Sequence, residues 1–196
     1  MTRGAREATV DRILAEASAL HEAVRRAGVE PIVAVADTLS AAFAAGGKVL
    51  VFGNGGSAAD AQHFAAELAV RFERERRALP ALALTADTTV VTAVGNDYGF
   101  AQVFARQVEA LGAAGDVAVG ISTSGTSANV LAGLETARRL GLTTVAMTGR
   151  DGGAIGKAAD VHLNVPHAST ARVQEVQRTQ IHAICALVEQ GLDDRG

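Results

Sequence analysis

Residues 48–71, KVLVFGNGGSAADAQHFAAELAVR, constrain the fold of this chain more than any other stretch. Four apolar residues lead into a glycine turn, and an Ala-rich segment follows. A short apolar run before glycines is typical of a buried strand, and the Ala-rich segment favours a helix. His63 and Glu67 lie four residues apart there, so a helix projects both from one face. The stretch therefore predicts a strand, a turn and a helix with a pair of groups suited to metal binding or proton transfer.

The order of strand, turn and helix recurs after residue 47. We expect strands at 48–52, 81–84, 90–94, 117–121, 143–147 and 160–165, and helices at 57–76, 99–111, 127–140 and about 171–191. Short apolar strands that alternate with helices predict a mostly parallel sheet covered on both faces. Two further helices, at 5–27 and from 31 to about 45, precede the first strand. Such a pair could cover a partner subunit or the sheet.

Composition limits the classes of protein to which the chain can belong. Apolar residues make up 48% and aromatic residues 4% of the 196 residues, which predicts one domain with an aliphatic core. A net charge of -3 argues against a nucleic-acid partner. Cys185 is the single cysteine, and no run of about 18 apolar residues is present, so we expect a cytoplasmic protein without a membrane partner.

The charged run RFERERR, residues 71–77, is interpreted as the solvated end of the helix at 57–76. Arg71 is a possible exception, because it lies four residues after Glu67 and continues its face.

Ligands of open parallel sheets bind beyond the carboxyl ends of the strands, which selects the turns at 53–57, 95–98 and 122–127. The last of these carries a cluster of hydroxyl residues before a helix, namely Ser122, Thr123, Ser124 and Ser127. Hydroxyls and backbone N–H groups at a helix N-terminus favour an anion, so we predict a phosphate site. The alternative is a helix cap with spare hydroxyls, although one Ser or Thr would suffice for that.

The turn at 53–58, GNGGSA, formally fits the dinucleotide fingerprint, which is weak alone. That fingerprint requires an acidic residue about 20 positions later at a strand end. The count reaches Glu73 and Glu75, inside the charged run, so we predict no nucleotide cofactor. The turn is interpreted instead as a close backbone approach to a ligand, with Ser57 as helix cap and phosphate donor.

Gln174, Arg178 and His182 lie in the last helix, where an isolated histidine is by default a packed residue. His21, His162 and His167 are expected to be structural or exposed. With His63 and Glu67, Gln174 and His182 would supply two imidazole nitrogens and two oxygens, a set suited to zinc, although spacing alone does not pair residues so distant in sequence. A phosphate site with a Glu/His pair indicates a sugar-phosphate isomerase.

The chain resembles the phosphoheptose isomerases of the sugar isomerase (SIS) domain superfamily, over nearly its whole length to residue 192. The stretches that carry the resemblance are FGNGGSAADAQHFAAEL, VGNDYGF, GISTSGTSANV, TGRDGG and ARVQEVQRTQIHAI. It implies a three-layer αβα sandwich around a five-stranded parallel sheet, a single SIS domain over residues 1–196. Residues 1–46 would serve packing and oligomerisation, and residues 47–196 would form the core and the last helix. It also implies a homotetramer with active sites at subunit interfaces. The reaction would convert sedoheptulose 7-phosphate to D-glycero-D-manno-heptose 7-phosphate, the first step towards activated heptose for lipopolysaccharide or other glycans.

The resemblance also implies roles for individual residues. Glu67 corresponds to a general base that moves a proton between C1 and C2 through an enediol, and His182 to its partner at the substrate oxygens. The ligands of one zinc ion per subunit would be His63, Glu67, Gln174 and His182, of which the first three would also line the substrate site. The phosphate cradle would be Ser57, Ser122, Thr123, Ser124 and Ser127. The sugar chain would be held by Asn54, Gly55, Gly56, Arg71, Asn96 and Asp97.

Three residues depart from the family pattern: Thr126 replaces a usual Asn, Ala171 an aspartate, and Gln177 a frequent histidine. None of them changes the Glu/His pair.

Two related functions compete, a non-catalytic SIS tetramer that binds the bacterial replication initiator protein and a sugar-phosphate-sensing regulator. The first lacks the catalytic Glu and His, and the second usually carries an extra DNA-binding domain. A dinucleotide-dependent oxidoreductase is a more distant alternative.

Overall fold

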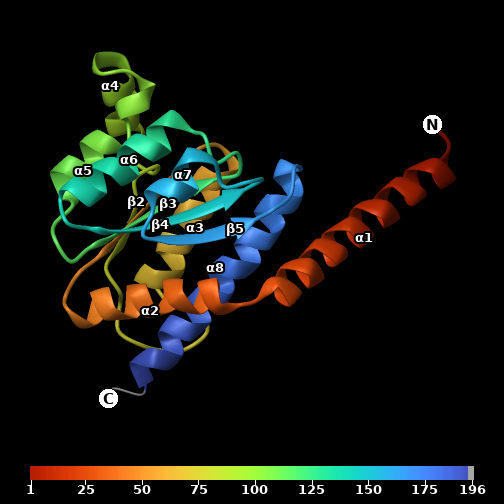
Figure 1. The fold of residues 1–196 in the computed structure, drawn as a ribbon, viewed down its shortest axis with the longest axis horizontal. Helices are drawn as coiled ribbons and strands as arrows, with labels where there is room; N and C mark the ends of the chain where they lie inside the picture. Colours follow the sequence, from red (N-terminus) through yellow and green to blue (C-terminus); the bar gives the residue numbers. More distant parts are fainter. Residues whose placement is uncertain (194–196) are drawn as a thin grey trace.

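Five parallel strands form the centre of the molecule (Figure 1). The structure is a computed structural model that describes residues 1–193. The strands are β1 (Val49–Gly53), β2 (Ala81–Ala83), β3 (Val117–Ser122), β4 (Thr143–Gly149) and β5 (Val161–Val165). Their order across the sheet is β2-β1-β3-β4-β5, and every neighbouring pair is parallel. The five-stranded parallel sheet expected from the sequence is confirmed.

Helices cover both faces of this sheet because alternate residues of each strand point in opposite directions. Val49 and Val51 pack into a core with the helices α2 (Glu30–Ala44), α3 (Gly56–Ala69) and α8 (Thr170–Asp193). Leu50 and Phe52 pack into a second core with α5 (Ala105–Leu111), α6 (Ala128–Arg139) and α7 (Gly153–Ala158). The three layers are as expected, and α7 is an additional helix that the sequence patterns did not indicate.

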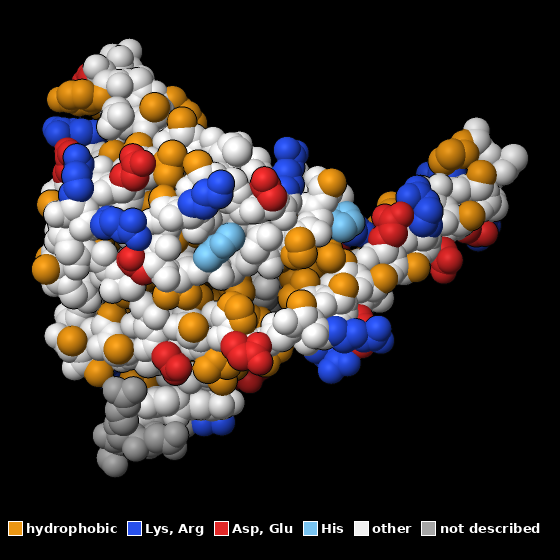
Figure 2. Space-filling model, viewed as in Figure 1, with side chains coloured by type: hydrophobic (Ala, Val, Ile, Leu, Met, Phe, Trp, Pro, Cys, Tyr) orange, Lys and Arg blue, Asp and Glu red, His pale blue; other side chains and the backbone are white. Residues whose placement is uncertain are grey.

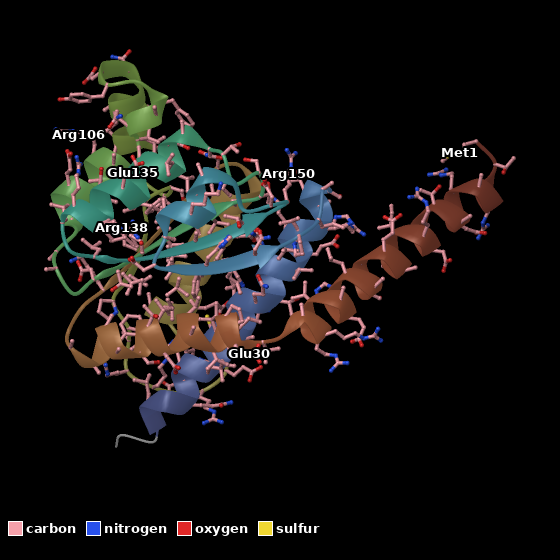
Figure 3. The ribbon with its side chains drawn as sticks, viewed as in Figure 1. Met1, Glu30, Arg106, Glu135, Arg138 and Arg150 are labelled. Carbon is pink, nitrogen blue, oxygen red and sulfur yellow. The ribbon has the colours of Figure 1, made fainter. Side chains whose placement is uncertain are left out.

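The first helix, α1 (Arg3–Ala27), extends away from the sheet and touches the rest of the chain mainly through α8 (Figure 1). Leu20 is buried, whereas Val10, Ile13 and Leu14 are exposed to solvent. Figure 2 shows hydrophobic side chains along this helix, and Figure 3 shows the helix with its side chains as sticks and Met1 at its outer end. Within residues 1–193 no single helix is long and apolar enough to cross a membrane; α1 and α2 meet those criteria only as a pair, which is bent by 75°.

The strand predicted at 90–94 is wrong, because this segment lies in the helix α4 (Thr88–Asp97). Asp87 precedes the helix, and its side chain accepts a hydrogen bond from the Val90 N–H at 3.0 Å. An Asp cap of this kind satisfies a donor that the first helical turn leaves free, and it outweighs the β-propensity of the Thr/Val run. Consequently residues 95–97, which we predicted as a turn after a strand, form the last turn of α4.

Two predicted helices have different bounds. The helix expected at 57–76 ends at Ala69, and residues 71–77 form a loop. The helix expected at 99–111 is divided into a short 3-10 helix, η1 (Phe100–Gln102), and α5. Gly99 precedes η1 at φ +83°, a left-handed conformation that interrupts a regular helix. The helices expected at 127–140 and 171–191 are confirmed within three residues at each end.

Candidate active site

The predicted site lies at the point where the order of the strands reverses. The chain passes from β1 outward to β2, and then returns to β3 on the other side of β1. The carboxyl ends of β1 and β3 therefore border the crevice in which open parallel sheets bind their ligands. The turns at 54–56 and 123–127 follow these two strands directly.

The glycine turn after β1 is linked to the first turn of α6 by hydrogen bonds between two side-chain amides. The Asn54 amide donates to Asn129 at 2.8 Å, and the Asn129 amide donates back at 2.9 Å. Asn129 is buried in the first turn of α6, and the sequence analysis missed it. Neither spacing nor composition in the sequence pointed to this contact. Gly55 takes φ +56° in this turn, and Ser57 is buried at the start of α3.

Three of the four predicted hydroxyl residues after β3 converge, whereas Thr123 is half-buried and has no hydroxyl contact with them among the described residues. The Ser122 hydroxyl lies 2.9 Å from that of Ser127 and 3.3 Å from that of Ser124. Thr126, one of the departures, joins the cluster, since its N–H and its hydroxyl donate to the Ser124 hydroxyl at 3.2 and 3.1 Å. The cluster stands before the N-terminus of α6, where backbone N–H groups and the helix dipole favour an anion.

His63 and His182, which are 119 residues apart, meet between α3 and α8. Their Nε2 atoms are 2.9 Å apart and share a hydrogen bond. Glu67 Oε1 lies 3.5 Å from His63 Nε2. The side chains of His63 and Glu67 are 30% and 21% exposed. Phe72 contacts the other side of His182, with ring centroids 5.4 Å apart. The arrangement places a carboxylate and two imidazoles within reach of one small ligand.

The other predicted residues of α8 also face α3. The Gln174 amide lies against Gly56, where a Cβ atom would be 2.2 Å from its nitrogen. Arg178 is ion-paired with Asp60, which is buried on α3.

Gln177 is buried and donates to the Thr148 carbonyl, so this departure from the family pattern serves packing between α8 and β4. Ala171 is exposed in the first turn of α8.

The four side chains predicted as zinc ligands have suitable donor atoms, but they are not arranged as a zinc site in this structure. Two imidazole nitrogens, a carboxylate and an amide oxygen are ligands that zinc accepts. Within residues 1–193, however, no group of three or more His, Cys, Asp and Glu is arranged to hold a metal ion. The hydrogen bond between the two Nε2 atoms would have to break before both could face one ion.

Three predicted residues stand apart from this cluster. The Arg71 side chain is 54% exposed and lies 3.9 Å from the Glu75 carboxylate. Asn96 and Asp97 are exposed at the end of α4, and the Asn96 amide donates to Asp97 at 2.7 Å. Among the described residues, Asn96 and Asp97 have no hydrogen bond to the side chains of the Glu/His cluster between α3 and α8. Figure 1 shows α4 projecting from the edge of the molecule, where it packs against η1.

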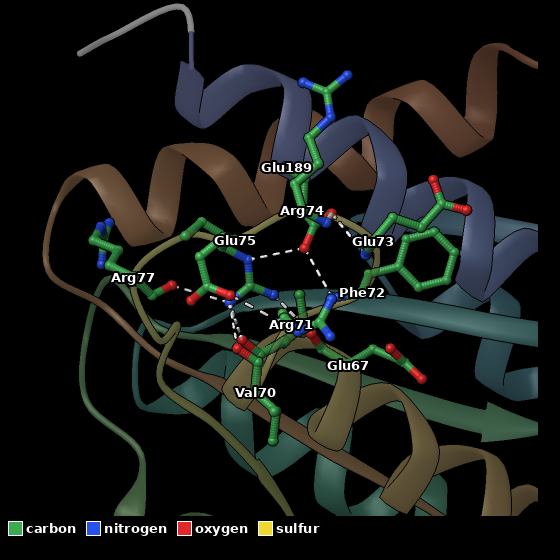
Figure 4. Close-up of polar contacts among 11 residues, drawn as sticks. Glu67, Val70, Arg71, Phe72, Glu73, Arg74, Glu75, Arg77 and Glu189 are labelled. Carbon is green, nitrogen blue, oxygen red and sulfur yellow. Dashed lines mark hydrogen bonds and ion pairs between the residues drawn. The ribbon is translucent and has the colours of Figure 1, made fainter.

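The charged loop 71–77 is not the solvated helix end that we predicted. Arg76 and Glu189 form an ion pair at 3.1 Å, with side chains only 5% and 2% exposed. Figure 4 shows Glu189 of α8 beside the loop residues 71–75 and the end of α3. Nothing in the run RFERERR distinguishes Arg76 from the arginines around it, so the burial of its side chain was not predictable from the sequence.

The remaining histidines are structural or exposed, as expected. His21 links α1 to α8 through Thr179 at 3.0 Å. His162 lies 2.6 Å from the Thr148 hydroxyl, and burial lowers its pKa. His167 is partly buried in the loop before α8 and accepts a hydrogen bond from the Ser169 N–H.

Comparisons with known proteins agree with this fold. The family model of the SIS domain matches residues 13–149. The phosphoheptose isomerase of Aquifex aeolicus is 52% identical over 186 residues, which cover 95% of this chain and 97% of that protein. A phosphoheptose isomerase structure from Neisseria gonorrhoeae is 47% identical with a TM-score of 0.89, and covers 94% of this chain and 98% of that one. A structure of the Francisella tularensis enzyme is 38% identical with a TM-score of 0.91, and covers 97% and 100%. The chain therefore belongs to the SIS domain family and, within it, to the phosphoheptose isomerases, which are sugar-phosphate isomerases.

Proposed function

We propose that this protein converts sedoheptulose 7-phosphate to D-glycero-D-manno-heptose 7-phosphate. The observation that carries the proposal is the meeting of Glu67, His63 and His182, from α3 and α8, in a fold that has a turn lined with hydroxyls at the switch point of its sheet. The phosphoheptose isomerase relatives support the same reaction class. We also propose that this reaction is the first step towards activated heptose for lipopolysaccharide or other glycans, and that it takes place in the cytoplasm.

Glu67 is the proposed base. Its carboxylate removes a proton from C1 of the ketose and returns it to C2, with an enediol between the two steps. The O1 hydroxyl becomes the carbonyl and the O2 carbonyl becomes a hydroxyl, so one proton must also leave O1 and reach O2. His182 is the proposed carrier of that proton, because an imidazole can donate and accept near neutral pH. No redox cofactor enters this balance, and none is proposed.

The substrate phosphate is assigned to the hydroxyls of Ser57, Ser122, Thr123, Ser124 and Ser127. This site has no lysine or arginine of its own in the turn, so the bound dianion would depend on hydroxyl and backbone donors and on the dipole of α6. The sugar chain is assigned to Asn54, Gly55 and Gly56, with contributions from Arg71, Asn96 and Asp97.

We propose one zinc ion per subunit, held by His63, Glu67, Gln174 and His182. When bound, zinc would polarise the substrate carbonyl as a Lewis acid. The donor types of the four side chains support this proposal, since two imidazole nitrogens, a carboxylate and an amide oxygen are groups that zinc accepts. Elemental analysis and titration with a chelator test it: an active, zinc-free protein that is indifferent to chelation would contradict the assignment.

We further propose a homotetramer with active sites at subunit interfaces. Exposed apolar side chains support it: Val10 and Leu14 on α1 are 56% and 62% exposed, and Tyr98 and Phe100 beside α4 are 58% and 61% exposed. Apolar surface of this kind marks interfaces. A second copy near α4 could also bring Asn96 and Asp97 into a site. The mass of the purified protein in solution tests this, and a monomer would refute it.

The decisive test of function is turnover of sedoheptulose 7-phosphate in D₂O. Active protein should form the aldose with deuterium at C2, detectable by NMR. Glu67→Gln should lose turnover while the mass in solution is unchanged, and Glu73→Gln, an exposed carboxylate on the following loop, should retain it. Full activity of Glu67→Gln would contradict the base assignment. Isomerisation of other sugar phosphates, but not this one, would contradict the substrate.

The alternatives are weaker on the same observations. A non-catalytic tetramer that binds the replication initiator protein has no need for a carboxylate and two imidazoles in contact between α3 and α8. A sugar-phosphate-sensing regulator has no need for them either.

A further inference from the structure

The loop 71–77, which joins α3 to β2, is fastened to α8 by a single buried carboxylate (Figure 4). Glu189 accepts hydrogen bonds from the N–H groups of Phe72, Glu73 and Arg74 at 2.8, 3.0 and 2.9 Å. Burial opposes its ionisation, but the bonds from the three N–H groups and the charge of Arg76 outweigh it and lower the pKa of Glu189. The carboxylate is thus a fixed anchor for the loop.

Arg76 connects the same anchor to the end of α3. Its Nε donates to Glu189 Oε1 at 3.1 Å. Its two terminal nitrogens donate to backbone carbonyls: Nη2 to Glu67 at 2.7 Å, and Nη1 to Leu68 at 2.8 Å and Val70 at 3.3 Å. The last carbonyls of a helix have no partners within it, and a cation beside them is favourable. The guanidinium therefore takes the place of the missing helical bonds.

This cap acts on the residue to which we assign the base. Glu67 lies in the last turn of α3, which ends at Ala69, and terminal turns fray unless something holds them. Arg76 bonds directly to the Glu67 carbonyl, so it fixes the backbone from which the carboxylate projects. The planar fork of arginine matches several carbonyls at once, which the point charge of a lysine does not.

The same anchor also reaches His182. Glu189 follows His182 by seven residues on α8, which places the two side chains about 20° apart on one face of the helix. Phe72, held by Glu189 through its N–H, lays its ring 5.4 Å from the ring of His182. Cys185 lies between them on α8: burial, and then the charges of Glu67 and Glu189, raise its pKa to about 12. The Glu189 anchor thus reaches the ring of His182 through Phe72.

We propose that Arg76 and Glu189 are positioning residues for the isomerase: together they lock the end of α3 and Phe72 so that Glu67 and His182 stand in register. The proposal rests on the proposed function of Glu67 and His182. Neither residue is assigned a contact with substrate. Their removal should therefore affect the chemical step more than substrate binding, because small misplacements of reacting groups cost rate steeply.

The test uses two variants that keep the charges and alter only the geometry, Arg76→Lys and Glu189→Asp. We expect kcat to fall about tenfold or more in each, with KM for sedoheptulose 7-phosphate and inhibition by inorganic phosphate changed less than about twofold. Arg77→Lys is the matched control for Arg76, since Arg77 is exposed on the same loop, and Glu73→Asp is the control for Glu189. Both controls should retain kcat. A lowered melting temperature with unchanged kcat would overturn the proposal, because it would make the pair merely structural.

Two further measurements keep the proposal open to refutation. If either variant fails to fold, Phe72→Leu decides, since Phe72 is half-buried and is the contact between the loop and His182. An unchanged kcat in Phe72→Leu would overturn the proposal. If the wild-type protein does not turn over the heptulose phosphate, the proposed function fails first. The imidazole NMR signals of His182 then test the positioning alone: they should shift in Arg76→Lys and not in Arg77→Lys, and no shift would overturn it.

Discussion

A substitution of Gly56, the first residue of α3, should change the activity of the site while leaving the stability of the fold nearly unchanged. A Cβ atom there would stand 2.2 Å from the nitrogen and 2.9 Å from the carbonyl carbon of the Gln174 amide. Gly56 does not have a positive φ, so alanine can adopt its backbone conformation. The Gly56→Ala substitution should therefore leave α3 intact and push the end of the Gln174 side chain out of the site.

The opposing contributions to stability are both small. Alanine is favoured over glycine in a helix by about 0.5–1 kcal/mol, and less at the first residue. A forced change of the Gln174 side chain costs about 0.5–1.5 kcal/mol. The free energy of unfolding should therefore change by less than about 1 kcal/mol. If Gln174 makes one hydrogen bond to a charged group in the transition state, its loss costs about 1.5–3 kcal/mol, which lowers kcat/KM about tenfold to a hundredfold.

Urea unfolding and isomerase kinetics on the same preparation measure both quantities. Gly4→Ala is the control, because Gly4 lies in the first turn of α1 and a Cβ there meets nothing within 4 Å. It should leave kcat/KM unchanged. An unchanged kcat/KM in Gly56→Ala would refute the role of Gln174. A loss of more than about 2 kcal/mol of stability would show that the backbone yields instead of the side chain.

Three other predictions concern the fold. Gly133→Ala should lower the free energy of unfolding by about 1–3 kcal/mol in urea titration, because its Cβ would stand 2.8 Å from the Phe52 ring and 3.1 Å from the Phe104 Cβ in a packed core. Acid should weaken the protein through Glu189: its lowered pKa stabilises the fold above the unfolded value of 4.5, and this contribution is lost as pH falls through the folded pKa. Unfolding curves from pH 7 to 3 should thus be less pH-dependent in Glu189→Gln than in the wild type, and an equal dependence would contradict the reasoning. The Cys185 thiol, whose pKa is raised to about 12, should resist a thiol reagent at pH 8 and react once urea unfolds the chain; rapid labelling of the native protein would contradict its burial.

Features with a local cause were predictable from the sequence. The hydroxyl cluster at 122–127 and the pair of His63 and Glu67 depend on residues within one turn and one helix, so spacing was enough to place them. The strand predicted at 90–94 failed for an equally local reason. The Thr/Val run favours a strand, and a single cap by Asp87 reverses it.

Features that join distant segments were not predictable. Asn129 is a polar residue in an unremarkable helix until the fold sets it against Asn54, 75 residues away. Arg76 has arginines on either side of it, and only the approach of Glu189 from α8 selects it for burial. Neither partner has a signature in spacing or composition.

The sequence by itself determined most of the succession of strands, turns and helices, and with it the parallel sheet and the edge of the sheet at which a ligand is expected. Alternation of side chains along a strand and their recurrence around a helix are properties of the local backbone, so a pattern of residues is enough to reveal them. Spacing alone did not pair His182 with His63, although the family resemblance did. The tertiary structure decided that these two side chains are in contact, that Phe72 packs on His182, and that Arg76 caps the helix of Glu67. These contacts follow from the packing of α8 against α3, which depends on how the whole apolar surface is buried.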